Sequence, residues 1–143
     1  DIIGLNITKD SEYLLVSDLQ NTSNTNLHLW YNDNTNNSNY YTQRIRGDGT
    51  SAAGYRENSS AYTQTLSSPA SSLSYQHIKL SNIGAFTAQS YSLKAPGTSS
   101  IQIENWFLSS TNENITSINT LRINSQNTNR IETGSRFQLY KLY

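Results

Sequence analysis

The sequence contains no cysteine and no long apolar run, and each absence excludes a class of protein. Without cysteine the chain forms neither a disulfide nor a thiolate metal site. No apolar run approaches the ~18 residues of a membrane span, so we expect no membrane insertion. The first residues, Asp1 to Gly4, do not resemble a signal peptide, and the missing initiator methionine suggests a processed chain or an excised segment.

Charge is also scarce. Ten Lys and Arg balance ten Asp and Glu, and charged residues make up 14% of the chain, well below the typical ~25%. A neutral surface attracts neither the phosphates of nucleic acid nor an anionic membrane, so we expect neither as a partner. Solubility must come from the abundant Asn, Ser, Thr and Gln, which also favour turns.

Apolar residues recur at every second position in several short segments. Such alternation predicts β-strands that bury one face. A more continuously apolar run over residues 12–19 is typical of a strand in the middle of a sheet. The alternating residues are Ile3, Leu5 and Ile7; Leu27, Leu29 and Tyr31; Ile78 and Leu80; Ile101 and Ile103; Leu121 and Ile123; and Phe137 and Leu139.

Polar turn signals separate these segments, and none of the intervening stretches has a helix-length amphipathic pattern. At 143 residues the chain has the length of one ordinary domain. We therefore predict an all-β fold: a single antiparallel, jelly-roll-like β-sandwich over residues 1–143. Residues 40–75 are interpreted as a hairpin with strands near 40–46 and 60–66. The turn signals are residues 21–26, 32–39, Gly47-Asp48-Gly49, Pro96-Gly97 and 127–129.

No pattern of catalytic or metal-binding residues emerges. His28 and His77 both fall on the polar face of a predicted strand and are interpreted as ordinary surface histidines. The stretch from Asp33 to Asn37 lacks the glycine and glutamate of a calcium loop, and Arg46-Gly47-Asp48 is interpreted as a glycine turn. No Gly-x-Ser-x-Gly elbow is present, and the carboxylates are scattered singly. We expect no enzyme, no cofactor and no metal.

The aromatic residues are the best candidates for a binding surface. Trp30 and Trp106 each alternate with the aliphatic residues of their own strand, which places them on the opposite face. Large exposed aromatics mark interfaces or ligand platforms, and Tyr40 and Tyr41 extend the candidate set. The alternative is that a loop covers each tryptophan or that a bulge turns it inward. Tyr55 and Tyr62 fall in the same aromatic-rich part of the chain.

The C-terminal sequence reads Gly134-Ser135-Arg136-Phe137-Gln138-Leu139-Tyr140. It resembles the ending of a β-sandwich module of tailed-phage structural proteins, in which a Gly-Ser-Arg-Phe-x-Leu-Tyr-Gly pattern closes the last strand. The N-terminal Ile3-Gly4-Leu5, the later Leu27-His28-Leu29-Trp30, and Ile115 to Ile118 fit the same module in order. One departure is Lys141, which stands where the family has glycine, so the last residues can prolong the strand.

The resemblance implies a component of the virion exterior: a fibre, appendage, tail or capsid-decorating module that is often multimeric. Its partners would be other virion subunits or further copies of itself, and an oligomer contact would bury Trp30 or Trp106. The alternative function is that of a carbohydrate-binding module that recognises host-surface glycans. In that case Trp30, Tyr40, Tyr41 and Trp106 would form the platform.

Overall fold

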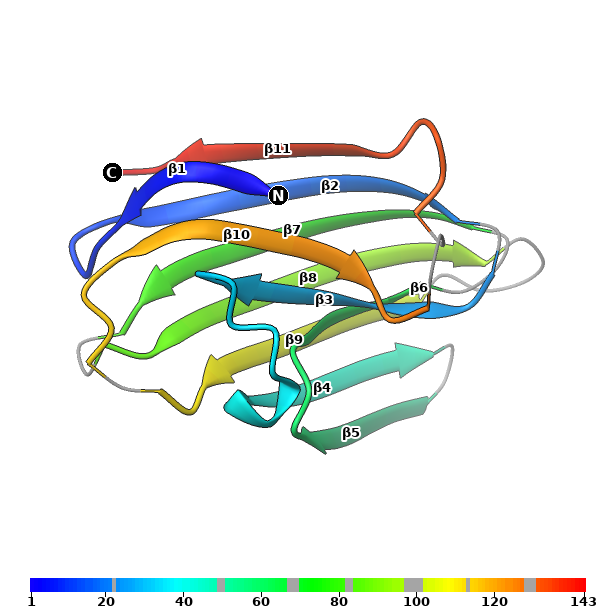
Figure 1. Ribbon diagram of the computed structural model, residues 1–143. Coiled ribbons are helices and arrows are strands. Elements are labelled where there is room, and N and C mark those ends of the chain that lie inside the picture. The colour runs from blue at the N-terminus through cyan, green and yellow to red at the C-terminus, as the bar shows by residue number, and fades with distance from the viewer. Residues whose placement is uncertain are drawn as a thin grey trace.

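The computed structural model contains two antiparallel β-sheets of four and seven strands, packed face to face (Figure 1). It describes residues 1–21, 23–48, 51–66, 70–81, 84–96, 102–112, 114–127 and 131–143. Within these ranges the one helical element is a 3-10 turn at Asn37–Asn39. The prediction of an antiparallel β-sandwich is therefore confirmed. No helix in the described ranges has the length and hydropathy needed to cross a membrane.

Each sheet draws its strands from distant parts of the chain. The small sheet has the order β1 (Ile2–Ile7), β10 (Ile118–Ser125), β3 (Thr25–Tyr31) and β6 (Tyr62–Leu66). The large sheet has the order β11 (Arg136–Lys141), β2 (Glu12–Asn21), β7 (Ala70–Leu80), β8 (Phe86–Pro96), β9 (Gln102–Ser110), β4 (Tyr40–Asp48) and β5 (Ser51–Asn58).

The chain passes repeatedly from one sheet to the other, as in a jelly roll. The first and last strands, β1 and β11, lie at the same side of the sandwich (Figure 1). The strands β6 and β5 form the opposite edges of the two sheets. Because the large sheet has three more strands than the small one, β4 and β5 extend past the strands that face them (Figure 1).

The core lies between the sheets and follows the alternation of the sequence. Ile78 and Leu80 of β7 and Leu121 of β10 are buried, as their spacing predicts. Phe137 and Leu139 of the last strand pack against the core. Burying each such side chain contributes about 1.5–3 kcal/mol relative to leaving it in water, so the two sheets are held together mainly by this layer.

Part of the interior is polar rather than apolar. Ser17 and Ser74 face each other across β2 and β7, with 2.5 Å between their hydroxyl oxygens. The hydroxyl of Ser90 donates to the carbonyl oxygen of Thr63 in the other sheet. Since these hydroxyls have partners, their burial carries little penalty. The middle of β7 and β8 therefore places small serines inside, which leaves Tyr75 and Tyr91 outside.

The C-terminal motif closes the large sheet in a specific way. Gly134 has φ +98°, a conformation that strongly favours glycine. The Ser135 hydroxyl accepts from the backbone N–H of Gln20 at 3.0 Å, and it lies 3.3 Å from the carbonyl oxygen of the same residue. The serine side chain thus bonds to β2, while its backbone N–H donates locally to the carbonyl oxygen of Glu132 at 3.2 Å. Arg136 to Lys141 then pair with β2, with Leu139 opposite Leu15.

Two predictions about the middle of the chain are wrong. Residues 40–66 do not form one hairpin: β4 pairs with β5, whereas β6 belongs to the other sheet. Gly47 lies within β4 and is absent from the described glycines with positive φ, so Arg46-Gly47-Asp48 is part of a strand and not a turn. Gly49 lies outside the described residues. The Asn-rich segment 32–39 is the loop that the composition predicts, with the 3-10 turn inside it.

Candidate functional site

The outer face of the large sheet carries a row of four aromatic rings from four neighbouring strands. Tyr75 of β7 lies directly opposite Tyr91 of β8. Phe107 of β9 is two positions along from the partner of Tyr91, and Tyr41 of β4 is two positions along from the partner of Phe107. The row therefore runs diagonally over β7, β8, β9 and β4.

All four rings are open to solvent. Their exposed fractions are 44% for Tyr75, 45% for Tyr91, 40% for Phe107 and 50% for Tyr41. Neighbouring residues on these strands, such as Ser74 and Ser90, point into the sandwich and are fully buried. Because side chains alternate between the faces of a strand, the buried small residues fix the aromatic residues on the outside.

A groove of about 750 Å³ lies along this row. Its rings are Tyr41, Tyr91 and Phe107, and polar side chains stand beside them. Volumes of this size are typical of sites for small organic ligands. The described polar residues that line the groove are Glu12, Thr42, Gln43, Arg56, His77, Lys79, Thr87, Gln89 and Ser109, and Ala88 and Leu108 complete the lining.

Hydrogen bonds hold the polar groups of the groove. The Nδ1 atom of His77 lies 2.9 Å from Oε1 of Glu12, and the Tyr143 hydroxyl donates to Oε2 of Glu12 at 2.7 Å. The bond from Tyr143, followed by that from His77, lowers the pKa of the Glu12 carboxyl below its usual value. At the other side, Nε2 of Gln89 donates to the Tyr91 hydroxyl at 2.6 Å and fixes that ring's edge.

Beyond the rings, the outer face becomes aliphatic. Ile45 and Ile103 are 57% and 60% exposed, and Leu73 belongs to the same face. Of the twelve exposed large apolar side chains among the described residues, eight lie on this one face. They are Tyr41, Ile45, Leu73, Tyr75, Tyr91, Ile103, Phe107 and Tyr140. Such a concentration marks an interaction surface.

Only one of the four residues predicted as a platform lies on this face. Tyr41 is exposed, but Trp30 and Trp106 are 8% and 2% exposed, and Tyr40 is fully buried. The faces were assigned correctly, since Trp106 does lie opposite Ile103. The orientation of that strand is nevertheless the reverse of what its aliphatic residues predict: Ile103 faces solvent and Trp106 faces the interior. The alternative of a covering loop holds for Trp30, whereas Trp106 is buried because its face of β9 points inward, without a bulge in the pairing.

A chain of stacked side chains explains why both tryptophans are buried. The His28 ring lies 4.8 Å from the rings of both Trp30 and Tyr62. Tyr62 in turn meets Trp106 edge-on at 6.4 Å, which links the small sheet to the large one. The Trp30 indole also donates to Oδ1 of Asn37 at 3.1 Å, so the Asn-rich loop covers it. The side chains of His28, Trp30, Tyr62 and Trp106 therefore pack together at the β6 side of the sandwich, and we call this group the second packed layer.

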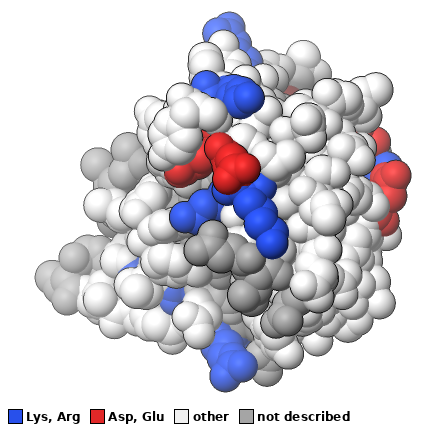
Figure 2. All heavy atoms as spheres, turned by 90° about the vertical axis from the view of Figure 1, so that its left-hand side faces the viewer, with Lys and Arg blue, Asp and Glu red and all other residues white. Residues whose placement is uncertain are grey.

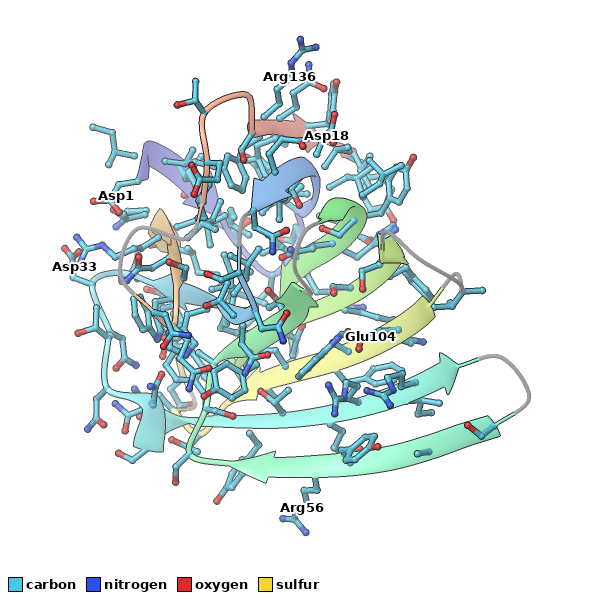
Figure 3. All side chains as sticks on the ribbon, turned by 90° about the vertical axis from the view of Figure 1, so that its right-hand side faces the viewer. Asp1, Asp18, Asp33, Arg56, Glu104 and Arg136 are labelled. Atoms are coloured by element: carbon cyan, nitrogen blue, oxygen red, sulfur yellow. The ribbon has the colours of Figure 1, made fainter. Side chains whose placement is uncertain are left out.

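Next to this layer lies a buried cluster of charged side chains, near the strands β4 and β5 that extend past the small sheet. The guanidinium of Arg44 lies 4.8 Å from the Trp106 ring and 4.2 Å from the Tyr55 ring. Arg44 also pairs with Glu104, whose side chain is fully buried. In Figure 3 Glu104 of β9 lies between the sheets, whereas Arg56 of the edge strand β5 points away from the molecule.

The prediction of two surface histidines is wrong for His28. Its side chain is 6% exposed, and burial lowers its pKa to about 4. His77 is half-buried and belongs to the groove. In the described ranges, no group of three His, Asp or Glu side chains is placed to hold a metal ion. The carboxylate of Asp33 instead pairs with Arg122 at 2.9 Å, and Asp1 shares the same arginine (Figure 3).

Sequence reasoning missed Tyr75, Tyr91 and Phe107. The signal was present: Ser74-Tyr75-Gln76 and Ser90-Tyr91-Ser92 alternate polar and aromatic residues. Such a segment is ambiguous, because either face can be the inner one. Comparison with known proteins adds no relative: no family model, no curated protein and no solved structure matches this chain.

Proposed function

We propose that this chain is a non-enzymatic component of a bacteriophage particle that binds other virion subunits, or further copies of itself, on the virion exterior. The resemblance of Gly134 to Tyr140 to a phage β-sandwich module supports the virion origin. The observation that carries a role in binding is the concentration of exposed apolar side chains on the outer face of the large sheet.

The contact surface proposed from the sequence changes as a result. Trp30 and Trp106 pack within their own chain, so they are not the residues that an oligomer contact would bury. The aliphatic part of the outer face, with Ile45 and Ile103, takes their place. Exposed branched side chains are unfavourable in water, and a subunit that covers them gains about 25 cal/mol for each Å² of apolar surface removed from water.

The charge distribution supports contacts of this kind. On the end of the sandwich that Figure 2 shows, most of the surface is uncharged, and acidic side chains lie beside Lys and Arg near the middle of the view. Interface centres are likewise poor in charged residues. Among the described residues that line the groove, Glu12 is the only carboxylate, whereas glycoside hydrolysis generally needs two across the scissile bond. This supports a binding protein rather than a hydrolase.

Two measurements test the proposal. Antibodies against the purified chain should label particles of the virus that encodes it, and labelling should survive purification of the particles. Absence of the chain from purified particles would show that it is not a virion component. For the contact surface, the double variant Ile45→Ser/Ile103→Ser should weaken assembly with the subunit that cross-links to the chain. Arg136→Ser, an exposed change on β11, is the matched control, and an equal loss in both variants would exclude the aliphatic face.

A further inference from the structure

We propose that the aromatic row and its groove bind an uncharged oligosaccharide, a function separate from the subunit contacts of the aliphatic region. The site consists of Tyr41, Phe107 and Tyr91, which line the groove, and Tyr75, which continues the row. The ligand would lie diagonally across the strands, along the line of the rings.

The shape of the site favours an elongated ligand. Directly opposed residues on neighbouring strands are about 5 Å apart and diagonal neighbours about 7–8 Å apart. The four rings step over β7, β8, β9 and β4 with one direct and two diagonal steps. Their line is therefore roughly 20 Å long. Several sugar rings in sequence fit such a strip, and each can stack a C–H face on an aromatic ring.

The side chains between the rings match the hydroxyl groups of a sugar. Gln89 and Gln43 flank Phe107 in the same cross-strand row, one on either side. Thr87 and Ser109 form a cross-strand pair beside them. Amides and hydroxyls both donate and accept hydrogen bonds, as sugar hydroxyls do. The site thus combines apolar faces with hydrogen-bonding edges, the arrangement expected of a specific small-molecule site.

The charges of the groove favour a ligand without net charge. The groove has two full cations, Lys79 and Arg56, and one anion, Glu12. Both carboxylate oxygens of Glu12 already have partners within the protein, Oε1 in His77 and Oε2 in Tyr143. A polyanion such as single-stranded nucleic acid also stacks on aromatic rows, but it requires a track of cations along its phosphates. The described residues of the groove do not supply one.

Affinity electrophoresis tests the site on the intact chain. The protein is run in native gels that contain a glucan, a mannan, a galactan, a xylan or a neutral bacterial O-polysaccharide, with heparin as the anionic comparison. We expect retardation in at least one neutral gel. Phe107→Ala and Tyr41→Ala should each weaken that binding at least tenfold. Ile103→Ala, which removes an exposed side chain from the same face outside the groove, is the matched control and should leave binding unchanged.

Each result has one meaning. No retardation in any neutral gel, or retardation by heparin alone, overturns the proposal. Equal binding by wild type, Phe107→Ala and Tyr41→Ala places the sugar elsewhere and also overturns it. A dimer that forms at high concentration and is lost in Phe107→Ala, without sugar binding, would show that a second copy covers the row. Thermal unfolding of each variant confirms that it is folded. Labelling of virions is independent of these outcomes, so the two proposals can fail separately.

Discussion

The indole Nε1 of Trp106 donates a hydrogen bond of 2.8 Å to Oε2 of Glu104, two residues earlier on the same strand and fully buried. The other carboxylate oxygen, Oε1, lies 3.6 Å from Nη1 of Arg44. Arg44 is itself held against the faces of Trp106 and Tyr55. A buried carboxylate is costly unless its charge is balanced, so the second packed layer depends on this arginine.

We expect Arg44→Met to destabilise the fold by about 3 kcal/mol, because the substitution leaves the Glu104 charge buried without its cation. In a Glu104→Gln background the same change should cost only about 1 kcal/mol, since a neutral amide needs no counter-charge and still accepts from Trp106. The difference is a coupling free energy, obtained from urea unfolding of the two single variants and the double variant.

The control for that cycle is Arg136→Met, which removes an exposed arginine on β11 and should change the unfolding free energy by less than about 0.5 kcal/mol. Additive effects of the Arg44 and Glu104 substitutions would show that the two charges do not stabilise each other, contrary to the geometry.

Three glycines should respond differently to alanine. Gly84 has φ +76°, and an added Cβ would lie 2.8 Å from backbone atoms of Asn114 and Ile115, so Gly84→Ala should cost about 2–4 kcal/mol. Gly134 has φ +98°, but an added Cβ would make only an ordinary contact of 3.8 Å with the Gln20 side chain, so backbone strain alone should cost about 1 kcal/mol. Gly54 has neither constraint, so Gly54→Ala should be neutral or slightly stabilising.

The rank order of these variants in thermal denaturation is the measurement. If Gly84→Ala were no more harmful than Gly134→Ala, the close approach of the Asn114 segment to Gly84 would be wrong. Gly54→Ala serves as the internal reference, because it adds the same methyl group to a strand without strain or contact.

Stability should fall in mild acid because of His28. Burial lowers its pKa to about 4, whereas the ordinary value is 6.5, so between these pH values the unfolded chain binds a proton that the folded chain does not. The contribution is fully present above pH ~6.5 and is lost as the pH falls toward 4, with a total on the order of 3 kcal/mol.

Urea unfolding at several pH values, compared with the variant His28→Phe, isolates this effect. The variant keeps the aromatic stack, but its unfolding free energy should change much less between pH 6.5 and 4. Below the ordinary carboxyl pKa a second decline should remain in both proteins, because the lowered pKa of Glu12 stabilises the fold only above that range. If the unfolding free energy of His28→Phe fell with pH as steeply as that of the wild type, the pKa of His28 would not be lowered in the folded chain.

Local alternation predicted the strands well, but not which face of each strand is buried. In β7, Ile78 and Leu80 identify the inner face because they are aliphatic and their neighbours are polar. In β9 the same rule fails. Glu104 lies inside, since Trp106 donates to one carboxylate oxygen and Arg44 balances the charge, and Ile103 is left outside. Hydrophobic pattern alone takes no account of a buried ion pair, so the sequence predicted the opposite orientation.

Local sequence patterns also could not predict which sheet each strand joins. Tyr62, the first residue of β6, comes four residues after Asn58, the last residue of β5. Nevertheless β6 pairs with β3 in the other sheet. Sequence spacing favours a hairpin there, whereas the observed pairing depends on contacts such as that between Tyr62 and His28. The candidate site was found only in part for the same reason. Tyr41 was named, but the row that it completes exists only once β4, β9, β8 and β7 are adjacent.

Both ends of the chain pair with partners more than a hundred positions away in sequence: Leu139 with Leu15, and Ile2 with Leu121. During synthesis the ribosome therefore has to deliver more than a hundred residues of this domain before either of these two ladders can form. Folds dominated by such remote pairings cross their rate-limiting barrier in milliseconds to seconds, since chain closure costs entropy before contacts repay it. Until β11 emerges, the nascent chain keeps the edge of β2 uncovered, and an unpaired edge of this kind can pair with another chain.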